Sequence, residues 1–333
     1  MATPNPLLMV PILVDDLARV ESELRASVLA EDPFLTEIAS HLINAGGKRV
    51  RPAFSVTSAA TVRAEMVPAS PEVVLGAVSV ELVHLGSLYH DDVIDDASTR
   101  RTVETVNSRW GNLKAILAGD YLLARASEIA AGLGVEVAGL LAATIARLCE
   151  GQMLELQTTF DPDRTEESYL TSITGKTASL LATACRIGGI VGGLERPVVD
   201  ELTEFGHSYG MAFQIVDDIL DVVATDAELG KPAGNDLVQG VYTLPVIRVL
   251  AAGGEDADRL GSMLGQPLTD TERDEARQLV RSSGQLDGAL DVARTYADRA
   301  DEALVNVGGT EAGTALIAAS NHLIDAVRVA GSR

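Results

Sequence analysis

Apolar residues recur with a helical period along almost the whole 333-residue chain, without convincing strand-like alternation. Hydrophobic residues make up 47% and aromatic residues only 4%, which suits packed aliphatic helices. No low-complexity linker divides the sequence. We therefore predict one all-α domain over residues 1–333, a single large helical bundle. The predicted helices span residues 15–29, 33–43, 52–64, 71–96, 113–131, 135–158, 166–188, 201–223 and 243–252, with more polar helices over 269–329.

The formal net charge of −22 excludes a nucleic-acid partner, because the phosphate backbone would be repelled. The N-terminal apolar run lacks the basic flank and cleavage site of a signal peptide. Arg186 interrupts the longest apolar stretch, residues 179–194, so we expect no transmembrane segment and a cytoplasmic protein. Cys149 and Cys185 lack metal-site or disulfide spacing and are expected to be buried, inert thiols.

The same acidic cluster occurs twice, as DDVID at Asp91–Asp95 and as DDILD at Asp217–Asp221. Each cluster places carboxylates at positions i, i+1 and i+4 of an apolar helical segment. The first and last of them lie one above the other on the helix. Each segment therefore carries a small group of carboxylates, and the two groups are predicted to line one cavity.

A single cluster of this kind is often only a solvated helix face. Both copies, however, are expected near the C-terminal ends of their helices, where the helix dipole disfavours carboxylates. Buried carboxylates also need a compensating positive charge. Hard cations such as Mg²⁺ prefer oxygen ligands and share them with substrate phosphates. The duplication therefore favours a metal role.

Basic residues gather at two places, in GGKRVRP at Gly46–Pro52 and at Arg100-Arg101. The first is a glycine turn followed by three cations, and its spacing is not that of a P-loop. These cations could instead serve only to cap the C-terminus of the preceding helix. The second follows the first acidic cluster closely, and arginine suits bidentate contacts to phosphate. Metal-binding carboxylates beside separate cations predict two anionic ligands, one held through metals and one held directly.

At this point the motifs resemble the trans-polyprenyl diphosphate synthases over essentially the whole length of the chain. The resemblance rests on these two basic segments and on ELVHLGSLYHDDVIDD, WGNLKAILAGDYLL, GQMLE, GKTASL, FQIVDDILD and GKPAGNDLVQG. It implies a helical bundle around a deep central active-site cavity, and usually a homodimer. It also implies condensation of isopentenyl diphosphate with an allylic diphosphate to an all-trans polyprenyl diphosphate. This product would then be delivered to a membrane.

The resemblance assigns the allylic diphosphate to the acidic clusters and to nearby polar residues. About three Mg²⁺ ions would be held by carboxylates, with Asp91 and Asp95 as the best candidates for direct coordination. The implied metal ligands are Asp91, Asp92, Asp95, Asp217, Asp218 and Asp221. The implied allylic-site contacts are Arg100, Lys176, Thr177, Gln214 and Lys231. Metals and cations there would stabilise charge on the departing diphosphate, so that an allylic carbocation forms.

Isopentenyl diphosphate would bind to Lys48, Arg51, His84 and Arg101, with its double bond directed at the cation. A histidine in an apolar helix is more often a hydrogen-bonded core residue. The position of His84, seven residues before Asp91 and two turns along the same face, favours the ligand interpretation. Two departures from the family pattern stand out: Val241 where lysine is common, and Thr102 where glycine is common.

Product length is predicted from the residues just before the first acidic cluster. Gly86 and Ser87 are small, whereas aromatic residues there form a floor in short-product members of the family. We therefore expect a long product, about C35 to C50, from a correspondingly deep tunnel. Gly86→Phe is expected to shorten it.

Three alternatives remain. A shorter-chain synthase making geranylgeranyl or farnesyl diphosphate would differ only in product size. A class I terpene cyclase would not need the second set of cations and typically has a different second acidic motif. A noncatalytic subunit of a heteromeric synthase is disfavoured because both acidic clusters are intact.

Overall fold

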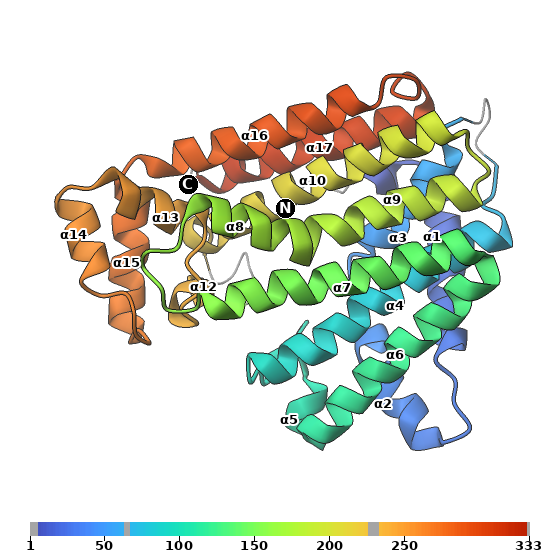
Figure 1. Cartoon of the computed structure of the whole chain (residues 1–333), viewed down its shortest axis with the longest axis horizontal. Helices are drawn as coiled ribbons and strands as arrows, with labels where there is room; N and C mark the ends of the chain where they lie inside the picture. The colour runs from blue at the N-terminus through green and yellow to red at the C-terminus, as the bar shows by residue number, and fades with distance from the viewer. Residues whose placement is uncertain (1–5, 63–66, 226–232, 332–333) are drawn as a thin grey trace.

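The computed structural model describes residues 6–62, 67–225 and 233–331, and these are almost entirely helical (Figure 1). A two-stranded antiparallel hairpin, β1 (Thr99–Arg100) and β2 (Val103–Glu104), follows the first acidic cluster. In chain order the helices are η1 (Pro6–Met9), α1 (Pro11–Ser27), α2 (Pro33–Asn44), α3 (Val50–Ala60), α4 (Pro71–Ile94), α5 (Val106–Trp110), α6 (Asn112–Leu133), α7 (Val135–Gln157), α8 (Glu166–Ile173), η2 (Thr174–Ala178), α9 (Ser179–Val191), α10 (Arg196–Val223), α12 (Asn235–Val238), α13 (Leu244–Ala252), α14 (Glu255–Gly261), α15 (Asp270–Ser282), α16 (Gln285–Ala303) and α17 (Glu311–Gly331).

Helix α4 forms the centre of one half of the core. The Ser70 side chain caps its first turn by accepting from the Val73 N–H, and Pro71 is at the first helical position. Its sequence is apolar on nearly all sides, which explains why it is buried between α3, α6 and α9. The carboxylates at its C-terminal end are therefore held by one of the best-buried elements of the chain.

Helix α10 organises the other half. It packs against α9, η2, α16 and α17, and its buried side includes Phe205, Tyr209 and Ile215. In Figure 1, α16 and α17 run above α10, whereas α7, α8 and α9 lie below it. Both acidic clusters lie at or near helix ends: α4 ends at Ile94 and α10 at Val223. This confirms the placement predicted from the sequence.

Most predicted helices are present, but three local features were not anticipated. The segment predicted as one helix over 166–188 is divided into α8, the π-helical turn η2 and α9. The hairpin at Thr99–Glu104 was not predicted, because its turn contains Arg101 and Thr102 in place of glycine or asparagine. Short helices such as α5 and α12 were also missed.

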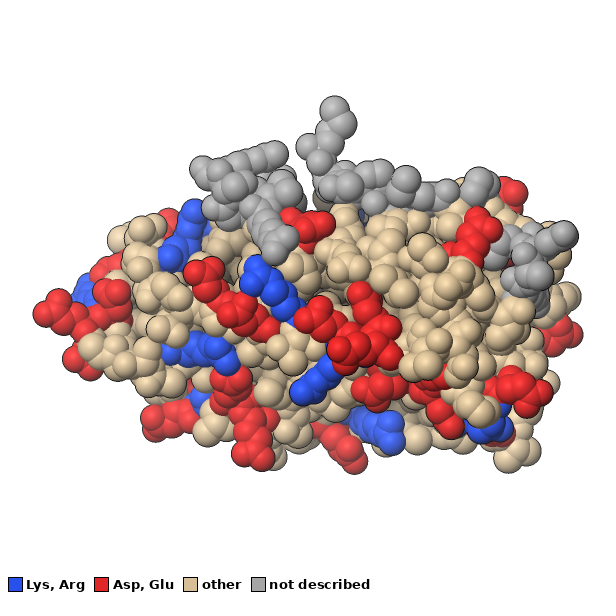
Figure 2. All heavy atoms as spheres, turned by 90° about the horizontal axis from the view of Figure 1, so that it is seen from above, with Lys and Arg blue, Asp and Glu red and all other residues tan. Residues whose placement is uncertain are grey.

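One expectation about exposure was wrong, namely that Cys149 would be buried. Helices α4 and α7 are both long and apolar enough to span a membrane, although 78% of the α4 window is buried inside the protein, compared with 22% for α7. The exposed side of α7 also carries Cys149, which is exposed, whereas Cys185 is buried as predicted. The excess of acidic residues is visible as scattered Asp and Glu on the face shown in Figure 2.

Candidate active site

The first acidic cluster lies where α4 terminates. Asp95 is the C-cap residue, and its N–H donates to the Asp91 carbonyl at 2.8 Å. Asp91 is half-buried and Asp95 is exposed, one helical turn apart. Burial raises the pKa of Asp91, although the positive charge of Lys176 opposes the shift. The cluster therefore holds a carboxylate whose charge a bound cation would stabilise.

Asp92 has a different environment. It is 1% exposed, and its Oδ1 accepts from Arg100 Nε at 2.5 Å. The Asn107 amide donates to the Asp92 backbone carbonyl at 3.0 Å. Arg100, predicted to contact the allylic diphosphate, is thus paired with a buried carboxylate. This arrangement leaves Asp91 and Asp95 as the more accessible pair of the cluster.

The second cluster divides in the same way. Asp217 is exposed, whereas Asp218 and Asp221 are buried. Asp218 accepts from the Tyr169 hydroxyl at 2.5 Å and from Gln214 Nε2 at 2.8 Å. One oxygen of Asp221 accepts from the Asp236 N–H at 3.4 Å, at the start of α12. Two of the three carboxylates therefore help to fix the surrounding loops and helices.

The π-helical turn η2 lies between the two acidic clusters. Lys176 Nζ pairs with Glu155 of α7 at 2.5 Å. Burial would lower the pKa of Lys176, but the charge of Glu155, together with those of Asp91 and Asp95, raises it. Thr177 Oγ1 donates to Gln214 at 2.8 Å, and Gln214 in turn bonds Asp218. Adjacent residues of η2 thus face one cluster each, which places both clusters beside the same turn.

Two glycines allow this turn to approach α7 closely. A Cβ atom on Gly151 would lie 2.5 Å from the Lys176 backbone nitrogen and 2.7 Å from the Ser172 carbonyl. A Cβ atom on Gly175 would lie 2.7 Å from the Arg147 carbonyl. The glycines of GQMLE and GKTASL therefore have a packing reason: they bring Glu155 within reach of Lys176.

The donor set fits hard cations that are shared with a ligand. Among the described residues, no three His, Cys, Asp or Glu side chains converge into a ready-made metal cage. The carboxylates are instead divided between the ends of α4 and α10. Mg²⁺ is commonly bound through one or two carboxylates together with phosphate oxygens. The two clusters suit ions completed by a diphosphate rather than a closed protein site.

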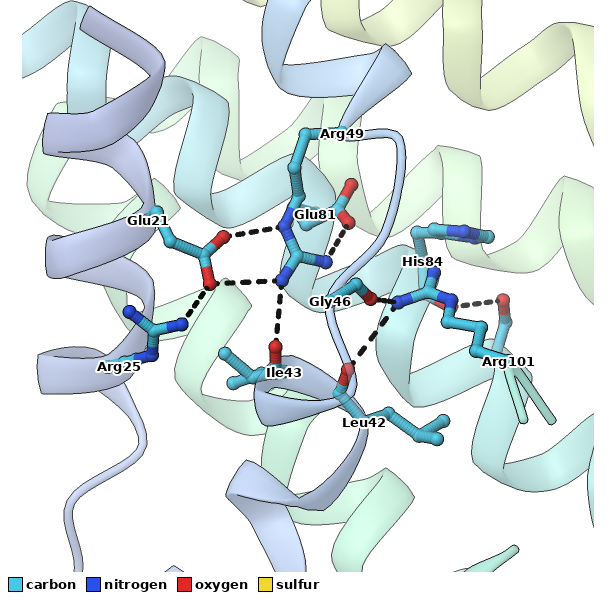
Figure 3. Close-up of polar contacts among 10 residues, drawn as sticks. Glu21, Arg25, Leu42, Ile43, Gly46, Arg49, Glu81, His84 and Arg101 are labelled. Carbon is cyan, nitrogen blue, oxygen red and sulfur yellow. Dashed lines mark hydrogen bonds and ion pairs between the residues drawn. The ribbon is translucent and has the colours of Figure 1, made fainter. Parts of the chain in front are cut away.

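A second pocket, rich in arginine, lies further along α4 around His84. Burial lowers the pKa of His84 well below its usual range, and the charges of Arg51 and Arg101 lower it further. His84 is therefore neutral near pH 7, with arginines from α3 and from the hairpin around it. Figure 3 shows Arg101 beside His84, directed at the turn that follows α2. Arg101 donates to the carbonyls of Leu42 and Gly46.

The remaining predicted cations are less constrained. Lys48 is exposed on the turn before α3. Lys231 lies outside the described residues. Val241, which stands where lysine is common in the family, is followed by Tyr242, whose carbonyl accepts from the buried Arg164 at 3.1 Å. A different cation therefore lies beside that loop.

The two predicted chain-length positions, Gly86 and Ser87, lie on different sides of α4. Ser87 is half-buried and is four residues before Asp91, on the same face of α4 as the half-buried His84. Gly86 is buried instead against α6, where an added Cβ would lie 3.1 Å from the Gly119 carbonyl and from Leu123. Gly86 therefore serves close helix packing, and we expect Ser87 to be the position at which a larger side chain shortens the product most directly.

Sequence reasoning missed several residues that hold the site. Tyr169 fixes Asp218, Glu155 pairs with Lys176, and Glu81 and Glu21 bind Arg49. Glu155 and Glu81 stand inside recognised motifs, which was the available signal. Tyr169 and Glu21 are far from any motif, so only the structure identifies them.

Replacing Thr102 with glycine is expected to stabilise the hairpin. Arg101 and Thr102 have φ values of 51° and 67°, a left-handed turn that disfavours a β-branched residue. Thr102 is exposed, and its hydroxyl bonds only the adjacent Arg101 carbonyl among the described contacts. Thr102→Gly should raise the free energy of unfolding by about 1 kcal/mol. Chemical denaturation measures the change. Thr102→Ala is the control, because alanine keeps the backbone strain and should give no gain in stability. Equal stability of the glycine and alanine variants would contradict the explanation.

The helical bundle, its two aspartate clusters and the separate cationic pocket define a prenyltransferase of the polyprenyl diphosphate synthase class. The family model described as polyprenyl synthetase matches residues 32–282, and the chain belongs to this family. It is 41% identical over 305 residues to nonaprenyl diphosphate synthase of Mycobacterium tuberculosis, covering 90% of each protein. It is 44% identical over 244 residues to heptaprenyl diphosphate synthase component 2 of Geobacillus stearothermophilus, covering 73% of this chain and 75% of that one.

A solved structure shares the whole fold. The chain matches polyprenyl synthase from Caulobacter crescentus, complexed with calcium and isoprenyl diphosphate, with a TM-score of 0.89 and 31% identity. The match covers 97% of this chain and 98% of that one. The arrangement of helices is thus that of an isoprenyl diphosphate synthase along essentially the whole chain.

Proposed function

We propose that this chain catalyses the Mg²⁺-dependent head-to-tail condensation of isopentenyl diphosphate with an allylic diphosphate, giving an all-trans polyprenyl diphosphate of about C35 to C50. One observation carries the proposal: two anion sites of different chemistry lie along α4. His84 is seven residues from Asp91, about 10 Å along the helix axis. Diphosphates held at these two places would lie side by side, as a condensation requires.

The proposed roles follow the geometry of each site. Bound Mg²⁺ would stabilise negative charge on the departing diphosphate. Asp91, Asp95 and Asp217 are the most accessible ligands, and Lys176 would contact the diphosphate after exchanging its Glu155 partner. The proposed supporting residues of the allylic site are Asp92, Asp218, Asp221, Arg100, Thr177, Gln214 and Lys231. The proposed isopentenyl diphosphate site consists of Lys48, Arg51, His84 and Arg101.

Product sizing tests the activity. The purified chain is incubated with Mg²⁺, isopentenyl diphosphate and farnesyl diphosphate, and the extracted products are separated by length. The expected result is a predominant product of about C35 to C50, formed only with the divalent cation. The long-chain relatives support this length. A predominant C20 product would overturn the length and retain the reaction, whereas recovery of only the C15 primer would reject the reaction.

A heteromeric synthase remains the second candidate, because the Geobacillus relative is named as component 2. Turnover by the purified chain alone supports a self-sufficient enzyme. Turnover only after a second protein is added would support the heteromeric assembly. Both intact acidic clusters favour the first outcome.

Mg²⁺ is expected to stabilise the protein more at high pH than at low pH. Burial raises the pKa of both Asp91 and Asp95, two of the proposed metal ligands. A raised carboxyl pKa means that the metal-free folded state loses stability as pH rises above about 4, the pKa in the unfolded chain. Metal binding needs the ionised form. Thermal unfolding with and without Mg²⁺ should therefore show a larger shift at about pH 8 than at about pH 5.5; equal shifts would contradict the metal role.

We also propose that the enzyme is a cytoplasmic homodimer with one domain over residues 1–333. Support comes from large apolar side chains exposed on α6 and α7, including Leu113 at 80%, Leu117 at 65% and Met153 at 55%. Such surface is commonly covered by another chain. Light scattering should give twice the chain mass, and Leu117→Arg should weaken the association; a monomeric wild-type protein would contradict the proposal.

A further inference from the structure

The guanidinium of Arg49 is bonded on every nitrogen to other parts of the protein. Nε and Nη2 contact the two carboxylate oxygens of Glu21 at 2.7 and 3.2 Å, and Nη1 contacts Glu81 at 3.1 Å. Nη2 also donates to the Ile43 carbonyl at 3.1 Å. Figure 3 shows Arg49 between these partners. The three cations of the glycine turn are therefore not equivalent, because Arg49 is committed to α1, α2 and α4.

These contacts hold a backbone conformation that arginine does not favour. Arg49 has φ 46° and ψ 40°, the left-handed region, at the residue before α3. This region is unfavourable for a residue with a side chain, because the Cβ atom comes too close to the following carbonyl oxygen. Burial alone would lower the pKa of Arg49, but Glu21 and Glu81 outweigh it and raise the pKa. The side chain is 9% exposed and Glu81 is 2% exposed, so the pair is shielded from water, where such contacts are strong.

The turn held by Arg49 positions the second-substrate pocket. Arg51 is in the first turn of α3, directly after Arg49 and Val50. Arg101 lies against Gly47, where an added Cβ would be 2.6 Å from its Nη1. Arg101 also bonds the carbonyl of Gly46. A shift of this turn would therefore move the cations contributed by α3 and by the hairpin together.

Glu81 connects this turn to the helix that carries both substrate sites. It is buried on α4, three residues before His84 and thus on a neighbouring part of the same face. A buried carboxylate at this place needs a cation; Arg49 bonds it directly, and the charges of Arg51 and Arg101 also act on it. The contact therefore joins the glycine turn to α4 at the height of the pocket.

We propose that Arg49, held by Glu21 and Glu81, is a positioning residue for the isopentenyl diphosphate pocket. It fixes the turn at Gly46–Arg51 so that Arg51 and Arg101 are held beside His84, and it does so without touching the substrate. The inference rests on the proposed function, because it assumes that this pocket binds the second diphosphate. It assigns to Arg49 an effect on affinity for one substrate only.

Steady-state kinetics of Arg49→Lys and Arg49→Gln test the inference. Lysine keeps the charge but loses the planar fork. Both variants should raise the KM for isopentenyl diphosphate about tenfold or more, equivalent to about 1.4 kcal/mol. The KM for the allylic diphosphate, and kcat at saturating isopentenyl diphosphate, should stay within about twofold. The matched control is Arg25→Gln, because Arg25 binds the same Glu21 at 2.8 Å from the exposed side and does not touch the turn.

A second variant and a binding measurement keep the test decisive. Glu81→Gln retains size and one acceptor oxygen, and should raise the same KM about threefold if the Arg49 variants fold poorly. Stabilisation by inorganic pyrophosphate without metal, measured by thermal unfolding, should be weaker in the Arg49 variants than in the wild type. Two outcomes would overturn the inference. In the first, the Arg49 variants raise the KM for both diphosphate substrates equally. In the second, both KM values and the stabilisation by pyrophosphate stay at their wild-type levels. Failure of the wild type to incorporate isopentenyl diphosphate would instead reject the proposed function, and the pyrophosphate measurement would still decide the role of Arg49.

Discussion

Asp91→Asn is expected to lower kcat by about three orders of magnitude, which corresponds to about 4 kcal/mol of lost transition-state stabilisation. Asp91 is half-buried at the end of α4, and Lys176 acts on its charge from η2. The amide keeps the shape but removes the negative charge that a divalent cation requires. The loss should therefore appear in turnover and in the concentration of Mg²⁺ needed for half-maximal rate.

Asp96→Asn is the matched control. Asp96 is exposed just beyond the helix, with φ 47°, a conformation that asparagine also tolerates. Activity of this variant should stay within about twofold of the wild type, because surface changes of this kind rarely disturb a site. Comparable losses of activity in the Asp91 and Asp96 variants would show that activity depends on the overall negative charge of this segment and not on Asp91 as a metal ligand. Mg²⁺-induced stabilisation in thermal unfolding gives a second readout that does not depend on turnover.

Ser87→Phe is expected to shorten the product from about C35–C50 to about C15–C20, because an aromatic ring would occupy the space next to Asp91 that the growing chain must enter. Ser87 is half-buried on the face of α4 that carries Asp91 and His84. Its hydroxyl bonds the His84 carbonyl at 2.8 Å within the helix, so the substitution breaks no contact to another element. Extraction and sizing of the products measures the change.

Two further variants define the position. Ser87→Ala removes the hydroxyl without filling space, so its product distribution should match that of the wild type. Gly86→Phe should lower stability before it alters length, because its ring would meet α6 at the Gly119 carbonyl. Long products from Ser87→Phe would show that the chain leaves the site along another path.

Helix positions were predictable because apolar periodicity is a local property. Helices α2, α6 and α7 begin and end within a few residues of the predicted ranges, where proline and glycine mark the boundaries. The hairpin escaped prediction because Arg101 and Thr102 adopt a turn that their own preferences oppose. The π-helical turn escaped because it results from close packing at Gly151 and Gly175, which are far apart in sequence.

The candidate site, too, was predictable where local sequence decides and unpredictable where tertiary packing decides. Residue type and spacing selected the two aspartate clusters and the two basic segments, and the family resemblance added Lys176 and the role of His84. They did not separate Arg49 from Arg51, although the two are neighbours in one motif. Only packing against Glu21 and Glu81 commits one of them to structure, whereas the other lies near His84 and Arg101.

The sequence by itself determined that this protein is an all-helical prenyltransferase with two aspartate clusters, because helical periodicity and motif spacing are written along the chain. Tertiary structure alone decided which member of each motif is accessible and which is committed to a partner. Asp92 pairs with Arg100, Asp218 with Tyr169, and Gly86 with α6. The physical reason is that burial, ion pairing and close approach depend on residues brought together from distant segments, which local pattern does not encode.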